Sequence, residues 1–271
     1  MRRLRRFFSS QPIIQKGQFI TLSLEETHHL KRIIRLAEGD SCLVTDGLGK
    51  EAQAKILKFE AHGSCSLVIE TVTQTVSPEE QNRVRIKVLQ ALAHKGVLEA
   101  LIEKSQEIGV EEFWPIQTKN STLKIRKEDE ARVLARWQKK VKEAAKQSGA
   151  FKLTLVQPVQ TLKEAVGRIS PNEKIIIFHP CGDAVPFRRW LEEVDKEAAS
   201  GRQVICNLCF GPEGGFDARE IEFLRNQSES KGISCKIVSL GGSILRIDTA
   251  FLGVVLALKL YLCQIKLDLS H

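Results

Sequence analysis

The most informative stretch of this chain contains two glycine-rich turns, GPEGGF (residues 211–216) and LGGSILR (residues 240–246). A short apolar, strand-like run precedes each turn, over residues 204–210 and 236–240. Glycine permits positive φ values and lets a ligand approach the backbone closely. Turns after parallel strands lie at the carboxyl edge of the sheet, where α/β proteins bind their ligands. The pair therefore predicts one shared binding pocket.

Each turn leads into a predicted helix. Asp217 and Glu220 have the spacing of a capping box, and Asp248 or Thr249 can cap the last helix. Residues 250–258 of that helix are apolar without interruption, far short of the roughly 18 residues of a membrane span. A helix that is apolar all round is buried on all sides. This one needs cover from its own domain or from a second subunit.

The glycine spacing excludes two common nucleotide sites. Neither turn matches the pattern of a dinucleotide-binding fold or of a P-loop. For either turn alone, a plain connecting turn remains an open interpretation. The placement of both turns between a strand and a helix favours a ligand site.

Both turns resemble the signature of the RsmE family of ribosomal RNA methyltransferases, which belong to the SPOUT superfamily. The resemblance rests on GPEGGF followed by LGGSILRIDTA (residues 240–250). It implies an α/β fold in which a SPOUT-type, trefoil-knotted parallel sheet carries helices on both faces, with a small N-terminal PUA-like β-barrel. It also implies S-adenosylmethionine (SAM) as methyl donor and N3 of a uridine in 16S, small-subunit ribosomal RNA as acceptor.

The residues of the two turns suit this chemistry. A cation such as Arg246 can stabilise the uridine anion that forms when N3 loses its proton, and we predict Arg246 and Glu213 as catalytic residues. Two other roles stay open: Glu213 as a cap of the following turn, and Arg246 as the partner of Asp248. The predicted SAM-binding residues come from both turns and from neighbouring strand ends: His179, Phe210, Gly211, Pro212, Glu213, Gly214, Gly215, Leu240, Gly241, Gly242, Ile244, Leu245 and Arg246.

The pattern along the 271 residues predicts two domains. Residues 1–75 are β-rich, with short strands at 41–45, 52–57 and 66–73 and a helix over 25–36. Residues 76–82 are polar and contain a proline, as a linker does. Residues 83–271 alternate strands with helices, which predicts a parallel sheet covered on both faces.

The resemblance to the RsmE family covers most of the chain. The segment HHLKRIIRLAEGD (residues 28–40) resembles the family's N-terminal RNA-binding domain, and residues 101–121 and 136–149 continue the match. The chain also departs from the family pattern. Asn120 and Ala150 stand at arginine positions, Lys146 and Asp248 at glutamate positions, and Gly242-Ser243 replaces a pair that usually ends in arginine.

The charge of the chain favours an acidic partner. The formal net charge is +8 and the isoelectric point about 9.1, as in many nucleic-acid-binding proteins. Each basic residue taken singly is equally well a solvated surface charge. The predicted RNA-phosphate contacts are Arg2, Arg3, Arg5, Arg6, Arg32, Arg35 and Lys95.

The cysteines indicate a reducing compartment without a metal site. The chain has seven cysteines, and Cys206 and Cys209 form a C-x-x-C pair inside an apolar run. No second pair has metal-site spacing, so buried reduced thiols are the better interpretation. The basic N-terminus lacks the apolar segment of a signal peptide, and a mitochondrial presequence stays open. We predict a cytoplasmic protein without membrane or metal.

Two functions remain open from the sequence. The first is a SAM-dependent methyltransferase that acts on 16S ribosomal RNA within the small ribosomal subunit, as a homodimer built around the last helix. The second is a non-catalytic RNA-binding protein that retains the SPOUT fold, as the departures at Asn120 and Asp248 would allow. Binding of SAM and transfer of its methyl group separate the two.

Overall fold

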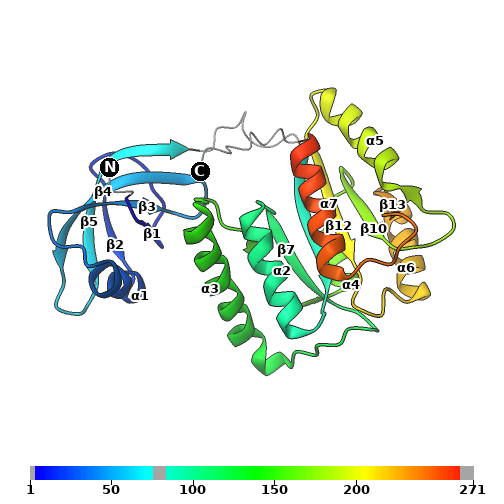
Figure 1. The fold of residues 1–271 in the computed structure, drawn as a ribbon, viewed down its shortest axis with the longest axis horizontal. Helices are drawn as coiled ribbons and strands as arrows, with labels where there is room; N and C mark the ends of the chain where they lie inside the picture. Colours follow the sequence, from blue (N-terminus) through cyan, green and yellow to red (C-terminus); the bar gives the residue numbers. More distant parts are fainter. Residues whose placement is uncertain (1–3, 76–83, 263–271) are drawn as a thin grey trace. The chain divides into compact units, whose positions relative to one another are not determined.

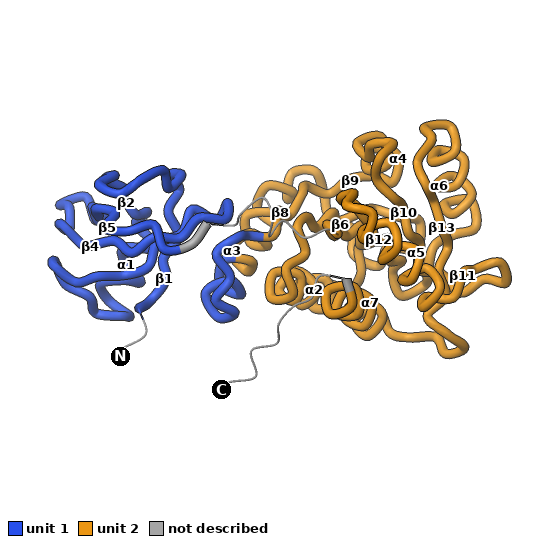
Figure 2. Tube along the Cα trace, turned by 90° about the horizontal axis from the view of Figure 1, so that it is seen from above, with its two compact units in different colours: residues 1–81, 142–153 blue, residues 82–141, 154–271 orange. Residues whose placement is uncertain are grey.

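The computed structural model describes residues 4–75 and 84–262 (Figure 1). The predicted linker over residues 76–82 and the predicted RNA contacts Arg2 and Arg3 lie outside these ranges. The chain forms two compact units, coloured separately in Figure 2. The first comprises residues 1–81 and 142–153, and the second comprises residues 82–141 and 154–271.

The first unit contains a five-stranded sheet in the order β1-β3-β4-β5-β2. All neighbours are antiparallel except β1 and β3, which are parallel. Alternate side chains such as Ile20 and Leu22 point into one apolar core, as expected for strands with one covered face. The elements are β1 (Arg6–Phe8), β2 (Phe19–Leu22), α1 (Leu24–His28), η1 (His29–Ile34), β3 (Ser41–Thr45), β4 (Lys50–Phe59) and β5 (Cys65–Thr75).

The helix predicted over residues 25–36 is two shorter pieces. The Ser23 side chain caps α1 by accepting from the backbone N–H of Glu26. The chain then widens into η1, a π-helix. Arg35 ends it with a left-handed φ of 61°, a conformation that non-glycine residues rarely adopt. Its backbone N–H donates to the carbonyl of Leu30, which satisfies the end of the turn.

Residues 142–153 belong to the first unit, although the sequence pattern grouped them with the second domain. They are the end of helix α3 (Glu130–Ser148) and the segment that follows it. The Thr45 hydroxyl donates to the carbonyl of Phe151 at 2.7 Å, and the N–H of Leu153 donates to the carbonyl of Gly47 at 2.9 Å. These contacts join segments about a hundred residues apart in sequence, which no local pattern predicts.

The second unit is built on a parallel sheet in the order β11-β13-β10-β12-β6-β7-β8, with β9 paired to β7. The predicted parallel sheet is therefore confirmed. Its elements are β6 (Val84–Ala91), α2 (Lys95–Glu107), β7 (Glu112–Gln117), η2 (Lys127–Asp129), α3, β8 (Leu155–Val156), β9 (Gln160–Thr161), α4 (Leu162–Gly167), β10 (Glu173–Phe178), β11 (Val185–Pro186), α5 (Phe187–Ala199), β12 (Val204–Phe210), α6 (Ala218–Ser230), β13 (Ser234–Ser239) and α7 (Ile247–Leu262).

Helices cover both faces of this sheet, and β12 shows how. Successive side chains of a strand point to opposite faces. Cys209 joins the apolar core formed with α4 and α6. Its neighbour Phe210 lies against Phe178 of β10 (centroids 4.8 Å apart, nearly parallel) and Phe251 of α7. Figure 1 shows α7 lying over the sheet close to α2, in agreement with their contacts.

The predicted helix starts are partly confirmed. Asp217 and Glu220 form the predicted capping box at the start of α6. The last helix begins at Ile247, so Asp248 lies inside its first turn instead of before it. α7 is not buried on all sides within one chain. Its inner face is buried, but Leu256, Leu260 and Tyr261 are exposed.

Candidate active site

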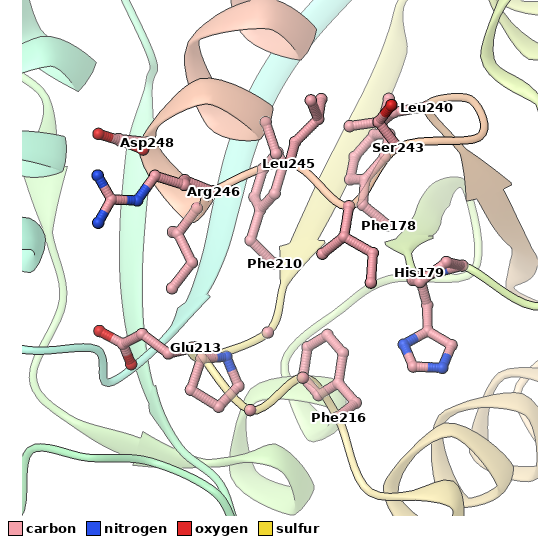
Figure 3. A pocket seen from close by; sticks show the side chains of 18 of the residues that line it. Phe178, His179, Phe210, Glu213, Phe216, Leu240, Ser243, Leu245, Arg246 and Asp248 are labelled. Carbon is pink, nitrogen blue, oxygen red and sulfur yellow. The ribbon is translucent and has the colours of Figure 1, made fainter.

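A cavity of about 810 Å³ lies at the carboxyl ends of β10, β12 and β13 (Figure 3). Residues 211–216 follow β12, and residues 240–246 follow β13. Because β10 lies between β12 and β13 in the sheet, the two turns meet across its end. His179, directly after β10, also lines the cavity. One cavity thus collects the strand ends that the sequence singled out.

Every predicted SAM-binding residue except Gly242 lines this cavity. The sequence did not single out several other lining residues. His94 follows the end of β6, and Phe178 is the last residue of β10, so their positions at strand ends were the available signal. Phe216 and Ser243 belong to the two turns that the sequence predicted to form the pocket. The other additional lining residues are Val97, Pro180, Val238, Ser239, Ile247, Asp248 and Ala250.

The cavity has an apolar interior and polar groups at its two sides (Figure 3). Phe178, Phe210 and Leu245 contribute apolar walls. Arg246 lies toward one side, and the His179 ring lies at the other. Burial lowers the pKa of His179, which favours the neutral imidazole at neutral pH.

Arg246 is exposed at the rim of the cavity. The pairing with Asp248 that the sequence left open is not present: within residues 4–75 and 84–262, no ion pair joins the two side chains. The Asp248 carboxylate accepts instead from the backbone N–H of Thr249 at 2.9 Å. The guanidinium is therefore available to a ligand at the cavity mouth.

Glu213 is held by two neighbouring loops. Its Oε1 accepts from the backbone N–H of His94 at 2.9 Å, and its Oε2 accepts from the Thr122 hydroxyl at 3.1 Å. Burial raises the pKa of Glu213, but these hydrogen bonds outweigh burial and hold the pKa below its usual value. The side chain of Asp217 caps the helix that follows, whereas the two carboxylate oxygens of Glu213 bond to the loops after β6 and β7.

The predicted RNA contacts within the described residues differ in their availability. Arg5, Arg32 and Arg35 are exposed in the first unit. The side chain of Arg6 is only 15% exposed and forms an ion pair with Glu51, which neutralises its charge. In the second unit, Lys95 is exposed at the first residue of α2, next to His94 of the cavity.

The cysteine pair lies inside the sheet. Cys206 and Cys209 are buried in β12, and burial raises the pKa of the Cys209 thiol. Among the described residues, no group of three or more histidine, cysteine or acidic side chains is arranged to hold a metal ion. No helix of that part of the chain combines the length and apolar character needed to cross a membrane.

Comparison with known proteins identifies the family. Residues 80–259 match the RNA methyltransferase domain family, and residues 22–70 match the RNA methyltransferase PUA domain family. The ribosomal RNA small subunit methyltransferase E of Synechocystis is 33% identical over 85% of this chain and 69% of its own length. The chain belongs to the RsmE family. The Bacillus subtilis protein of the same name is 26% identical over 91% of both chains.

Solved structures share the fold of this chain. A Legionella pneumophila protein in complex with bound SAM superposes with a TM-score of 0.76 at 25% identity, covering 95% of this chain and 98% of its own. A ribosomal RNA small subunit methyltransferase E from Neisseria gonorrhoeae superposes at 0.74 with 24% identity, covering 95% and 97%. The predicted family resemblance and fold class are confirmed.

Proposed function

We propose that this protein transfers the methyl group of SAM to N3 of a uridine in 16S ribosomal RNA. The observation that carries the proposal is the shared cavity: the turns over residues 211–216 and 240–246, which hold the family's two motifs, line one apolar pocket with an arginine at its rim. Its volume, about 810 Å³, is within the range of roughly 300–1,000 Å³ typical of ligand sites.

Two features of the cavity lining suit SAM. Phe178, Phe210 and Leu245 offer apolar surface to the flat adenine. A Cβ at Gly241 would meet no atom within 4 Å, so a ligand can approach this part of the second turn closely. SAM supplies an activated methyl group on its sulfonium.

The reaction requires a base, an acceptor held in line and a group that stabilises negative charge. The bond from N3 to the methyl carbon forms as the sulfur–methyl bond breaks, and the N3 proton leaves to a base. The cavity walls hold the acceptor in line with the breaking bond. We propose that Arg246 stabilises the negative charge that the uridine carries as its proton departs. Its exposed position at the rim supports this role.

The RNA is held, in this proposal, mainly through its phosphates by Arg5, Arg32, Arg35 and Lys95, together with Arg2 and Arg3, whereas Arg6 is engaged with Glu51. Such binding weakens steeply with salt. The division into domains at residues 1–75 and 83–271, with residues 142–153 contributed to the first compact unit, and the substrate context of the small ribosomal subunit are part of the same proposal. A cytoplasmic location stays a prediction.

We further propose a homodimer built around α7. Leu256 and Leu260, one turn apart, form an exposed apolar stripe with Tyr261, and such stripes mark interfaces. Ile244 and Leu245, on the turn that leads into α7, are exposed as well. Because this turn lines the cavity, a partner seated on the stripe would lie beside the site and could complete it.

The proposal is tested by titrating SAM into the protein calorimetrically and then supplying small-subunit ribosomal RNA. We expect binding and a 3-methyluridine product. SAM binding without transfer to RNA, or RNA binding without SAM binding, would favour the alternative of a non-catalytic RNA-binding protein that keeps the fold.

A further inference from the structure

Three loops meet beside the cavity at the carboxyl edge of the sheet. They follow β12, β6 and β7, which are neighbours in the order β12-β6-β7. The β12 loop is the GPEGGF turn, and the other two loops span residues 92–94 and 118–126. Side-chain hydrogen bonds join the GPEGGF turn to both of its neighbours. These bonds hold the GPEGGF turn, which forms part of the cavity wall.

The acidic side chain of the turn makes the first set of bonds. Glu213 Oε1 accepts from the N–H of His94 in the β6 loop, and Oε2 accepts from the hydroxyl of Thr122 in the β7 loop. Thr122 in turn donates its backbone N–H to the carbonyl of Leu92 at 3.2 Å. A carboxylate with both oxygens engaged and a lowered pKa is a poor acceptor for a substrate proton.

The carbonyls of the turn make the second set. Asn120 Nδ2 donates to the carbonyl of Gly215 at 3.1 Å and lies 3.4 Å from that of Gly214. On the other side, Gln90 Nε2 donates to the carbonyl of Gly211 at 3.2 Å. Gln90 is fully buried, so its orientation is fixed by its surroundings. The two ends of the glycine turn are thus held by Gln90 of the adjacent strand β6 and by Asn120 of the loop after β7.

The surroundings of two glycines show that the GPEGGF turn is closely packed. A Cβ at Gly211 would come within 3.1 Å of the backbone nitrogen of Phe216, and a Cβ at Gly214 would meet the Asn120 side chain at 3.4 Å. The turn is packed against itself and against Asn120. A cavity whose wall is fixed before the ligand arrives costs less ordering on binding than one that must be assembled.

We infer that Thr122 and Asn120 are positioning residues of the site. Glu213 acts with them: it fixes the GPEGGF turn in its SAM-accepting conformation and is not the base. The inference rests on the proposed function of the cavity. None of the three touches the reacting atoms in this role. Their effect reaches the ligand through the backbone of the turn.

Thr122→Val tests the contact most cleanly, because it removes the hydroxyl with little change in volume and Thr122 is exposed. We expect the Kd for SAM, measured by calorimetry, to rise about two- to tenfold, as for loss of one hydrogen bond. At saturating SAM and RNA, kcat should change less than about twofold, because uniform binding is lost and not transition-state stabilisation. Thr122→Ser, which keeps the hydroxyl, should restore the wild-type Kd.

Glu213→Gln separates positioning from base catalysis. Loss of a general base lowers kcat by about 10²–10⁴-fold. A positioning residue instead raises the Kd for SAM while kcat at saturation stays within a few-fold. A fall in kcat of that size with unchanged Kd would overturn the inference, and so would an unchanged Kd for SAM in Thr122→Val.

A measurement without SAM tests the positioning role of Thr122 independently of the proposed function. The N–H of Gly215 donates to the carbonyl of Pro212 at 2.8 Å, so its hydrogen exchange reports whether the turn is closed. Exchange at Gly215 should be about two- to tenfold faster in Thr122→Val than in Thr122→Ser. If the wild-type protein binds no SAM, the proposed function fails, and this exchange ratio alone decides whether Thr122 fixes the turn; a ratio near one overturns that too.

Discussion

The side chains of Glu26 and Lys146 form an ion pair in the first unit, with Nζ of Lys146 2.6 Å from Oε1 of Glu26. The other carboxylate oxygen of Glu26 accepts from the backbone N–H of Phe8 at 3.2 Å. Glu26 is almost completely buried. Lys146 departs from the family pattern, and here it neutralises a buried carboxylate that would otherwise be costly.

Replacing Lys146 should therefore destabilise the first unit. Lys146→Met leaves the Glu26 carboxylate buried without its cation, and we expect a loss of about 1–3 kcal/mol in the free energy of unfolding. Amide exchange of β1 and β2 measures this locally. Lys142→Met, at an exposed position of the same helix, should change stability by less than about 0.5 kcal/mol. Equal effects of the two substitutions would show that the ion pair contributes nothing specific.

Gly211→Ala should impair the SAM site directly. The new Cβ would lie 3.1–3.2 Å from backbone atoms of Gly215 and Phe216, and backbone atoms cannot move aside without distorting the turn. We expect the Kd for SAM to rise by about tenfold or more, with the protein still folded. Gly182→Ala is the matched control, since a Cβ there meets nothing within 4 Å. A tight SAM complex in Gly211→Ala would locate the cofactor elsewhere.

Arg246→Met should separate catalysis from binding. We expect kcat to fall about 10²–10³-fold, as when a group that stabilises developing negative charge is removed, while the Kd for SAM changes only a few-fold. Arg202→Met, at an exposed position in the loop before β12, should have no effect on either. If Arg246→Met keeps wild-type kcat, another group must stabilise the uridine anion.

SAM binding should depend on acid pH through Glu213. Its hydrogen bonds need the ionised carboxylate, and they hold its folded-state pKa below the usual value of 4.5. The stabilising contribution is therefore fully present above 4.5 and is lost as the pH falls through the lowered pKa. The contribution of Glu213 to the Kd for SAM should be constant from pH 8 to about 5, and the Kd should rise below about pH 5. In Glu213→Gln the Kd for SAM should not rise at acid pH. An equal rise in the variant would show that another group causes the pH dependence.

Leu256→Glu should disrupt the proposed homodimer. Leu256 is 39% exposed on the outer stripe of α7, and a charge there is poorly tolerated in an apolar interface. Light scattering at micromolar concentration should show a dimer for the wild type and a particle near the monomer mass of 30.4 kDa for the variant. Leu57→Glu, at a residue 40% exposed in the first unit, should leave the dimer intact. A wild-type monomer with full activity would refute the dimer.

The sequence predicted the parallel sheet and both cavity-lining turns, because glycine spacing and capping residues such as Asp217 act over a few neighbouring positions. It did not predict β8 or β9, which are two residues long each and carry no periodicity. Nor did it predict that Thr122 bonds to Glu213, 91 positions away. Contacts of that kind depend on strand order. The sequence predicted a surplus apolar face on α7, but it did not show which residues form that face, because nearly every residue of the helix is apolar.

Methyl transfer from SAM to ribosomal RNA can be measured on the RNA product itself. Small-subunit ribosomal RNA lacking the modification is incubated with the protein and SAM labelled in its methyl group, and the RNA is then digested to nucleosides and analysed by mass spectrometry. We expect labelled 3-methyluridine, formed by the wild type and strongly reduced in Arg246→Met. RNA that is bound by the protein but carries no label, or a label on a different base, would contradict it.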